Sequence, residues 1–592
     1  MCGIIALTGN KIREISPSHI DAMLDLLSHR GPDDRGLLPF SSCILGQTRL
    51  SIIDLSGGHQ PMKDNQKNIA VTFNGEIYNY RELKTDLEQK GHVFSTKSDT
   101  EVILKAYIQY GIDCPKYLEG MFAFALWDEE KKMLFGARDR FGEKPLYYAK
   151  TKSGDFIFAS EIKALLASGT IEPVINKEAL DIYLSLAYVP PHMTVYENIS
   201  VVPPASCFVL KNSEIKIETY WELTKKEVSV TYADAKEEVR RMLEQSVKKM
   251  MVADVEVGAL LSGGVDSTLV TCFSQQTSSF PIKTFSVGYE HYINELPFAE
   301  QVSKKFHTDH HTLQATGEMA ESLRMVCGSL DEPHGDPSNF PQYLVSQFAA
   351  SKVKVALTGD GADELFMGYG WYWKHLNLSW KADFWEKAFP RPFKNFIRSI
   401  EIFTATQKRG LLAHSPLRAA DFIPEHILHA AGDDIEKINL FDLSFYLPGK
   451  LLSKVDRTAM MSSLETRCPF LDRELAEFVY NLPRNFKTDK NSGKIILKDI
   501  LSDIMPRDFV YRKKQGFGAP VKVWLEIETM RKLVAETFDN NAPFYEYIDK
   551  EEVQKLLKNF YSKTDETVYY KIWTLLCLGL WFQTHPSTSS GL

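Results

Sequence analysis

The sequence lacks three features that would place it in a special class of protein: long apolar runs, patterned cysteines and a large excess of one charge. No apolar run approaches the roughly 18 residues of a membrane span, and the first residues do not resemble a signal peptide. The 8 cysteines include no Cys-x-x-Cys pair and no cysteine–histidine cluster at zinc spacing. A formal net charge of -8 does not favour a nucleic-acid partner. We therefore expect a cytoplasmic protein without disulfides, structural metal, membrane contact or bound nucleic acid.

The length and the local patterns predict two domains. A chain of 592 residues is too long for one core, because single cores stop growing near about 250 to 300 residues. The first third contains short alternating strands, as at 69–73, 121–127 and 133–137, with helical stretches at 20–28 and 101–110, which predicts a layered α+β domain. A Pro-rich passage at 202–205 and a charged stretch ending near 230 follow. We place the domains at 1–215 and 230–585.

The second domain reads as an α/β unit. An amphipathic helix is predicted over 232–251, and the apolar segments 257–261, 283–287 and 353–357 alternate with helical patterns at 268–273 and 298–306. Such alternation predicts a parallel sheet with crossover helices. The last third is mostly helical in pattern, and the Ser-rich tail at 587–591 is predicted to be disordered.

Cys2 is a candidate nucleophile. If Met1 is removed, Cys2 carries both a thiol and a free α-amine, whose pKa values lie near 8.5 and 8 in unperturbed groups. About a tenth of such an amine is free base at pH 7, so it can accept the thiol proton during attack without a catalytic histidine. The alternative is that Cys2 is only the second residue of a buried strand.

Five further segments decide between these interpretations. They are His29 to Asp33, Arg49 to Asp54, Phe73 to Asn79, Ser98 to Glu101 and Arg138 to Pro145. Together they resemble the glutaminase domain of class II amidotransferases, which implies an N-terminal nucleophile hydrolase fold of four αββα layers. The resemblance implies that Arg49 grips the glutamine carboxylate, that Glu76 and Asp99 receive its ammonium, and that Asn74 with the Gly75 N–H forms an oxyanion hole.

Each of these residues also has an ordinary structural alternative. Asn74-Gly75 is a common turn sequence, Asp99 could cap a helix that starts at Thr100, and Arg49 could form a surface ion pair. Five matches in the order of the family make coincidence improbable.

The segment Ser262-Gly-Gly-Val-Asp-Ser267 follows an apolar strand and opens a helix. Its backbone N–H groups and hydroxyls can converge on an anion at the helix N-terminus, and we expect a pyrophosphate. It is not a Walker loop, because it contains no lysine. It resembles the loop of enzymes that cleave ATP to AMP and pyrophosphate, although a Gly-Gly pair alone could be a tight turn.

A second acidic loop, Thr358 to Glu364, follows the apolar strand at 353–357. Strand-end loops of a parallel sheet meet at one edge, so Asp363 could share a magnesium ion with Asp266. Two carboxylates together with phosphate oxygens suit that hard cation.

Further motifs continue through the second half of the chain. They are Asp331-Glu-Pro, Asp336-Pro-Ser, Tyr446-Leu-Pro, Lys454 to Arg457, Ser463 to Asp472, Gly493 to Leu497 and Lys514 to Gly518. Together with the first domain, they resemble asparagine synthetases over nearly the full chain. The resemblance implies an ATP-pyrophosphatase-like second domain with a helical C-terminal part. The residues it implies for ATP binding are Leu260, Ser262, Gly263, Gly264, Asp266, Ser267, Val287, Thr358 and Gly359.

Two residues are implied in the second reaction. Asp360 would help to form an acyl-adenylate, and Lys494 would neutralise charge on the reacting phosphate, although it could be a solvated helix lysine. Cys468 reads as a core residue. The sequence departs from the common pattern at Ala362 and at Phe366-Met367-Gly368, which could alter the acceptor pocket.

The resemblance implies glutamine-dependent synthesis of asparagine from aspartate, with ATP and Mg²⁺ as cofactors, by a possible homodimer. The nearest alternative keeps this chemistry but amidates another carboxylate, such as a uronic acid of a surface polysaccharide. A regulatory relative without activity and a ring-closing synthetase are further alternatives. The intact Cys2, Arg49, Asn74 and Asp99, together with the 262–267 loop, argue against both.

Overall fold

The computed structural model describes residues 1–289, 295–315, 319–382, 392–414, 416–418, 421–512 and 520–585. The match at 514–518 and the tail at 587–591 lie outside these residues. No helix in the described part of the chain combines the length and apolar character needed to cross a membrane.

The first unit contains two six-stranded sheets, in which all neighbouring strands pair antiparallel. One sheet has the order β10-β8-β9-β1-β3-β2 and the other β12-β11-β7-β6-β5-β4. The strands are β1 (Gly3–Thr8), β2 (Asp34–Pro39), β3 (Cys43–Arg49), β4 (Met62–Asp64), β5 (Ile69–Ile77), β6 (Gly120–Asp128), β7 (Met133–Arg138), β8 (Tyr147–Lys150), β9 (Phe156–Ala159), β10 (Ile199–Val201), β11 (Ser206–Lys211) and β12 (Glu214–Thr219).

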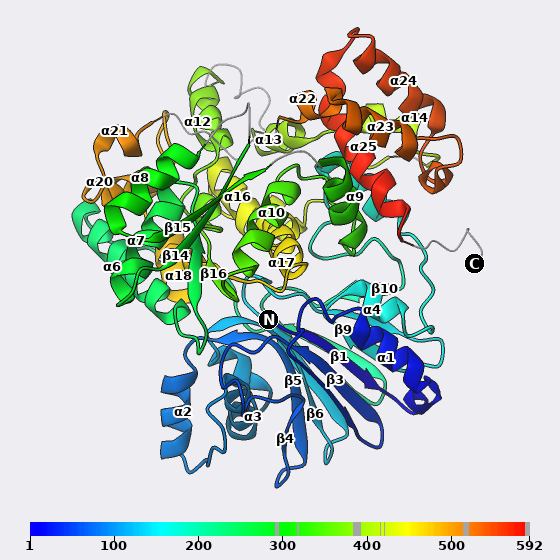
Figure 1. The fold of residues 1–592 in the computed structure, drawn as a ribbon, viewed down its shortest axis with the longest axis vertical. Helices are drawn as coiled ribbons and strands as arrows, with labels where there is room; N and C mark the ends of the chain where they lie inside the picture. The colour runs from blue at the N-terminus through cyan, green and yellow to red at the C-terminus, as the bar shows by residue number, and fades with distance from the viewer. Residues whose placement is uncertain are drawn as a thin grey trace.

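Helices cover the outer face of each sheet (Figure 1). Helices α1 (Pro17–Asp25) and α4 (Ile162–Leu166) pack on the first sheet, and α3 (Asp99–Tyr110) packs on the second beside α2 (Tyr80–Gln89). Between the sheets lies a buried apolar cluster that includes Ile4, Leu45, Ala125 and Phe158. The predicted four-layer αββα architecture is therefore confirmed.

The second unit is built on a five-stranded parallel sheet with the order β15-β14-β13-β16-β17. The strands are β13 (Val257–Leu260), β14 (Lys283–Tyr289), β15 (Asp309–Ala315), β16 (Val355–Leu357) and β17 (Glu465–Arg467). Helices α6 (Tyr232–Met250), α7 (Val265–Thr277), α8 (Leu296–Phe306), α10 (Asn339–Ala350) and α17 (Ser453–Met460) surround it. The predicted α/β class is confirmed, and β15 and β17 are strands that the sequence patterns did not indicate.

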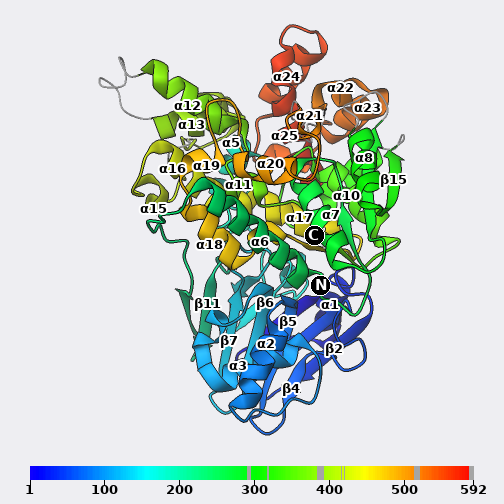
Figure 2. The same ribbon diagram turned by 90° about the vertical axis from the view of Figure 1, so that its left-hand side faces the viewer.

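The rest of the second unit is mainly helical, as predicted (Figures 1 and 2). Its helices are α9 (Met319–Ser329), α11 (Ala362–Leu365), α12 (Gly370–Ala382), α13 (Pro392–Ile400), α14 (Ala405–Leu411), α15 (Glu425–Leu428), α16 (Asp434–Phe441), a π-helical stretch (Asp442–Leu452), α18 (Arg473–Asn481), α19 (Arg484–Lys487), α20 (Ile495–Ser502), α21 (Arg507–Val510), α22 (Val521–Glu526), α23 (Glu528–Thr537), α24 (Lys550–Tyr561) and α25 (Tyr569–Phe582). Helix α5 (Lys177–Leu186) precedes β10.

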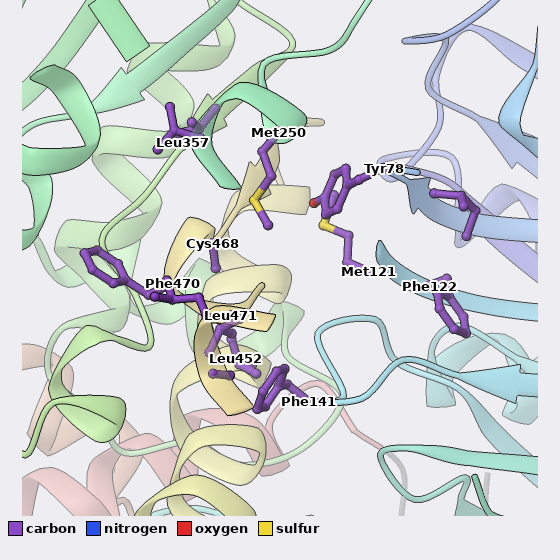
Figure 3. Packing of buried hydrophobic residues seen from close by; sticks show 14 of the residues in the cluster. Tyr78, Met121, Phe122, Phe141, Met250, Leu357, Leu452, Cys468, Phe470 and Leu471 are labelled. Atoms are coloured by element: carbon purple, nitrogen blue, oxygen red, sulfur yellow. The ribbon is translucent and has the colours of Figure 1, made fainter. Parts of the chain in front are cut away.

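An apolar cluster joins the two units (Figure 3). Side chains of Tyr78, Met121 and Phe141 from the first unit belong to the same buried cluster as Leu452 and Phe470 from the second. Figures 1 and 2 both place the N-terminus at this junction. The candidate nucleophile therefore lies where the units meet.

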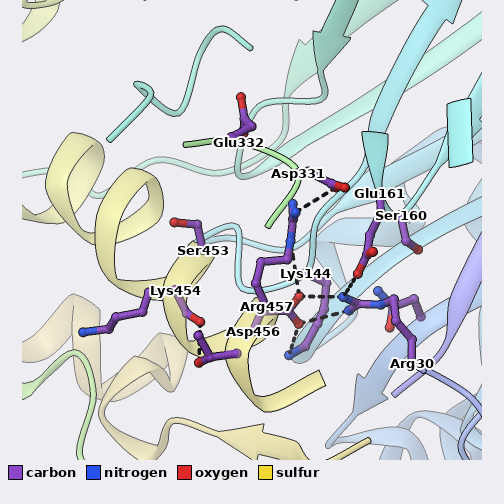
Figure 4. A network of polar contacts seen from close by, with 12 residues as sticks. Arg30, Lys144, Ser160, Glu161, Asp331, Glu332, Ser453, Lys454, Asp456 and Arg457 are labelled. Carbon is purple, nitrogen blue, oxygen red and sulfur yellow. Dashed lines mark hydrogen bonds and ion pairs between the residues drawn. The ribbon is translucent and has the colours of Figure 1, made fainter. Parts of the chain in front are cut away.

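A buried polar network also links the two units (Figure 4). Arg30 donates from Nη1 and Nη2 to the two carboxylate oxygens of Asp456, at 2.9 and 3.1 Å, and from Nη1 to Glu161 at 2.8 Å. The Lys144 ammonium lies 3.5 Å from Oδ1 of Asp456. Burial opposes the ionisation of Asp456, but Arg30 and Lys144 outweigh it and lower the pKa of that carboxyl. The interface thus contains paired charges as well as apolar contacts.

Candidate active sites

Cys2 lies directly before β1 and is buried. Its backbone N–H donates to Oδ1 of Asn74 at 3.0 Å, and its carbonyl accepts a hydrogen bond of 3.1 Å from Arg30 Nε. Burial raises the pKa of the thiol. In this structure Met1 precedes Cys2, and the amine of Met1 lies 3.2 Å from Oε2 of Glu465. The alternative of a buried strand residue is correct for the burial of Cys2 but not for the strand, which begins at Gly3, and burial does not conflict with a chemical role.

Asn74 and Gly75 belong to β5 and not to a turn, so the turn alternative is wrong. Asn74 is fully buried, and its Nδ2 has no hydrogen-bond partner among the described residues. Gly75 has a φ of +147°, and a Cβ there would lie 2.0 Å from the carbonyl oxygen of Met121. Only glycine fits this backbone. A buried, unused amide donor beside Cys2 is what an oxyanion site requires.

Asp99 and Arg49 are both buried. Ser98 accepts a hydrogen bond from the N–H of Thr100 and caps α3, so the alternative that Asp99 is the cap is wrong. Asp99 instead accepts a hydrogen bond of 3.0 Å from the N–H of Ile77, and burial raises its pKa to about 6. Arg49 donates from Nη2 to carbonyl oxygens of residues 53 and 54 at 3.0 and 2.9 Å. The surface-ion-pair alternative for Arg49 is therefore also wrong.

Glu76 faces the second unit. Its Oε1 lies 3.6 Å from Nη2 of Arg467, which in turn donates from Nε to Glu465 at 2.7 Å. Burial and the nearby carboxylates of Asp99 and Glu465 raise the pKa of Glu76, and Arg467 opposes this shift. The sequence match at 463–472 contained Glu465 and Arg467 but gave no reason to assign them a role, because nothing in the local pattern indicated their burial.

The second cluster lies at the carboxyl ends of β13 and β16, which are parallel neighbours. Ser262 and Ser267 hydroxyls lie 3.0 Å apart across the loop, whose last glycine, Gly264, directly precedes α7. Gly263 has a φ of +73°, and a Cβ there would lie 2.7 Å from Cβ of Phe298. The loop therefore presents backbone N–H groups at the start of a 13-residue helix, as an anion site requires.

Lys494, Asp266 and Asp363 converge from three separate segments. The Lys494 ammonium lies 2.6 Å from Oδ2 of Asp266 and 2.8 Å from Oδ1 of Asp363. Lys494 is only 4% exposed, so the solvated-lysine alternative is wrong. Burial opposes its charge, but the two carboxylates outweigh burial and raise the pKa of Lys494.

These two carboxylates fit a divalent cation. Both contact the same ammonium nitrogen, so their oxygens lie close enough together to share one cation, and carboxylate oxygens are the ligands that Mg²⁺ prefers. In the part of the chain that the structure describes, no group of three or more His, Cys, Asp or Glu side chains could hold a metal. A magnesium ion held by Asp266 and Asp363 would therefore need phosphate oxygens and water to complete its coordination.

The other predicted nucleotide residues surround this cluster. Leu260 ends β13 and packs, with Val287 of β14, against the same small apolar cluster. Thr358 is buried, and its N–H donates to the Arg467 carbonyl at 2.9 Å. The next two residues, Gly359 and Asp360, are partly exposed. Cys468 is buried, as predicted for a core residue, and its sulfur lies 3.5 Å from the Thr358 hydroxyl.

The positions that depart from the common pattern also lie at this cluster. Ala362 is fully buried at the start of α11, and Met367 is buried with a φ of +51°. Gly368 follows it, and a Cβ there would lie 2.1 Å from Oδ1 of Asp363 and 2.2 Å from Cε of Lys494. The backbone at Gly368 therefore packs directly against the side chains of Asp363 and Lys494.

Family models match both units of the chain. The model described as asparagine synthase matches residues 238–584, and the model described as glutamine amidotransferase domain matches residues 1–221. The chain belongs to the asparagine synthase family. It is an enzyme of glutamine-dependent amide ligation, and ATP is a substrate of its family.

Several relatives of this asparagine synthase family member span most of its length. Asparagine synthetase [glutamine-hydrolyzing] 1 of Bacillus subtilis (strain 168) is 34% identical, with 95% of this chain and 93% of the relative covered. Putative asparagine synthetase [glutamine-hydrolyzing] 2 of Methanocaldococcus jannaschii is 38% identical, covering 65% of this chain and 78% of the relative. Amidase chyE of Penicillium rubens is 26% identical, covering 95% and 96%. Two relatives with different names, the Bacillus subtilis asparagine synthetase and the Penicillium rubens amidase, thus each match 95% of this chain.

Proposed function

We propose that this enzyme makes asparagine from aspartate, ATP and the ammonia of glutamine. The observation that carries the proposal is the pair of polar clusters in one chain: Cys2 with the unused Nδ2 of Asn74 in one unit, and Lys494 between Asp266 and Asp363 in the other. In this proposal residues 1–215 form the glutaminase domain and residues 230–585 the synthetase domain. The products are asparagine, glutamate, AMP and pyrophosphate.

In the first domain, the Cys2 thiol attacks the amide carbon of glutamine once Met1 has been removed. The α-amine of Cys2 accepts the thiol proton and returns it to the leaving ammonia. Asn74 Nδ2 and the Gly75 N–H stabilise the oxyanion, while Arg49 holds the substrate carboxylate and Glu76 with Asp99 hold its ammonium. Water then hydrolyses the glutamyl thioester to glutamate.

In the second domain, the loop of Ser262, Gly263, Gly264 and Ser267 holds the pyrophosphate part of ATP. Thr358 and Gly359 contact the nucleotide, and Asp360 helps to form the acyl-adenylate. Leu260 and Val287 flank the adenine. An aspartate oxygen attacks the α-phosphate, pyrophosphate leaves, and ammonia then displaces AMP from the acyl-adenylate. Lys494 neutralises charge that develops on the phosphate.

Asp266 and Asp363 would hold Mg²⁺, which supplies charge neutralisation on the phosphate oxygens when bound. The shared position of the Lys494 ammonium between these carboxylates supports this ligand pair. We further propose a cytoplasmic enzyme that works on small molecules and not on nucleic acid or membranes, as a homodimer.

The acceptor is tested directly by supplying ATP, magnesium and ammonium with aspartate, glutamate or a nucleotide-linked uronic acid. Ammonium bypasses Cys2, so the assay isolates acceptor choice. We expect aspartate-dependent pyrophosphate release and an asparagine mass in the product. Turnover with the sugar acid but none with aspartate would overturn asparagine synthesis and favour the uronic acid alternative, while leaving amide ligation intact.

A further inference from the structure

Arg467 lies between the two candidate sites and contacts both. It is the last residue of β17, the edge strand of the parallel sheet, and it is 0% exposed. Its Nη2 lies 3.6 Å from Oε1 of Glu76 in the first unit. Its carbonyl accepts the hydrogen bond from Thr358, the first residue of the second acidic loop. One residue therefore links the glutamine-side carboxylate to the ATP-side loop.

The remaining guanidinium donors are fixed by other partners. Nε donates to Glu465 at 2.7 Å, and Nη1 donates to the carbonyl oxygens of Met250 and Val252 at 2.6 and 2.8 Å. Nη2 has no hydrogen-bond partner within the described residues. The guanidinium is thus anchored on one side, and its unused donor faces Glu76.

Arg467 lies among three buried carboxyl groups. Its charge acts on Glu76, Asp99 and Glu465, and it lowers the pKa of each of them. Arg467, 3.6 Å from Glu76, opposes the effect of burial on the pKa of Glu76 and so favours the ionised carboxylate that a substrate ammonium needs. A bound ammonium adds a second cation beside Glu76 and so changes the charge balance around the guanidinium. The Arg467 carbonyl accepts a hydrogen bond from the N–H of Thr358. A shift of the Arg467 side chain can therefore be transmitted through its own backbone to the ATP loop.

We propose that Arg467 is a positioning residue that couples the glutamine pocket to the ATP loop. Its side chain orients Glu76 for the ammonium of glutamine, and its carbonyl holds Thr358 in place. The inference rests on the proposed function for the identity of the two ligands. Coupling of this kind is reciprocal, so ATP and acceptor must also change the affinity for glutamine.

The test measures glutamate release with and without ATP, magnesium and aspartate. The quotient of the two kcat/KM values for glutamine is the coupling ratio, which we expect to differ from one in the unmodified enzyme. Arg467→Gln should bring this ratio to one and raise KM for glutamine about tenfold, a loss of about 1.4 kcal/mol. Ammonium-dependent synthesis should stay within about twofold, because the substitution leaves the Arg467 carbonyl that holds Thr358 in place. A twofold change corresponds to less than about 0.5 kcal/mol in activation free energy. Arg467→Lys keeps the charge but not the planar fork, and should restore part of the ratio.

Arg473→Gln is the matched control, because Arg473 also bridges the units, through a 2.7 Å contact with Glu119, but touches neither site. It should leave the coupling ratio unchanged. Glu76→Gln removes the same contact from the other side, so it should also give a ratio of one, and adding Arg467→Gln should change the ratio no further. Glu76→Gln carries the test if Arg467→Gln does not fold in a thermal unfolding scan.

Three results would overturn the inference: a ratio of one in the unmodified enzyme, a normal ratio in Arg467→Gln or Glu76→Gln, or equal loss of glutaminase and ammonium-dependent activity. Asparagine synthesis from ammonium by the unmodified enzyme is measured first. Its absence would overturn the proposed function, whereas a ratio insensitive to Arg467 would overturn only the coupling.

Discussion

Replacing Asn74 with Ala tests the oxyanion site. The Nδ2 of Asn74 is buried without a partner among the described residues, so this donor is free for a charge that appears only during the reaction. One such donor is worth about 2.7 to 4 kcal/mol, which corresponds to a 10²- to 10³-fold loss of kcat. Oδ1 also holds the Cys2 N–H at 3.0 Å, so the loss should lie toward the upper end of that range.

The assay follows glutamate release from glutamine and, separately, asparagine formation from ammonium. Asn74→Ala should impair the first and spare the second. Asn74→Asp is a sharper variant, because it keeps an acceptor for Cys2 but replaces the donor with a negative charge. Asn79→Ala is the matched control: Asn79 follows on the same segment but bonds to residues 117 and 119, away from Cys2. A loss below about threefold in Asn74→Ala would refute the oxyanion role, since one donor is worth far more.

Other predictions address both domains. Cys2→Ala should abolish glutamine use and leave synthesis from ammonium, and equal loss of both would contradict two separate sites. Asp266→Asn should block pyrophosphate release while glutaminase activity survives, and near-normal release in excess magnesium would contradict the metal assignment. Because Asp99 has a pKa of about 6, it is ionised above that pH, so KM for glutamine should rise as the pH falls through 6. Asp99→Asn should flatten that rise. Gly368→Ala should disable the synthetase alone, because the new Cβ would lie 2.2 Å from Lys494 Cε and displace that side chain. An active synthetase in this variant would contradict the role of Lys494.

The sequence patterns predicted elements with strong local periodicity and missed those defined by distant contacts. The strand predicted at 69–73 extends to Ile77 in the structure, so β5 includes Asn74, Gly75 and Glu76. It continues this far because β6 pairs with β5 along its whole length. The pattern appeared to end where polar residues begin. Pairing with a neighbouring strand overrode that local signal.

The strand β17 was missed for a related reason. Its three residues, Glu465–Arg467, include two charged side chains, which in a local pattern indicate an exposed loop. Both are fully buried, because each charge finds a partner in the other unit or on the strand itself. Lys494 is similar: its partner Asp266 lies 228 positions away, so no local pattern indicates that the lysine is buried.

The resemblance to known families grouped Cys2 with Asn74, and the strand-end argument placed Asp363 near Asp266. The structure brings both pairs together, and it adds Lys494 between the two carboxylates. The resemblance did not indicate Arg467, because a motif match records which residues recur and not what they touch.

The buried ion pair between Arg30 and Asp456 restricts how this protein can be divided or recombined. Separating the units would strand a fully buried guanidinium and uncover Tyr78, Met121 and Phe141, so a fragment cut in the linker should aggregate. A glutaminase unit borrowed from another protein would also have to bring a matching arginine. Changes on the two faces of this junction are therefore expected to arise in pairs, and each unit restricts the sequence of the other.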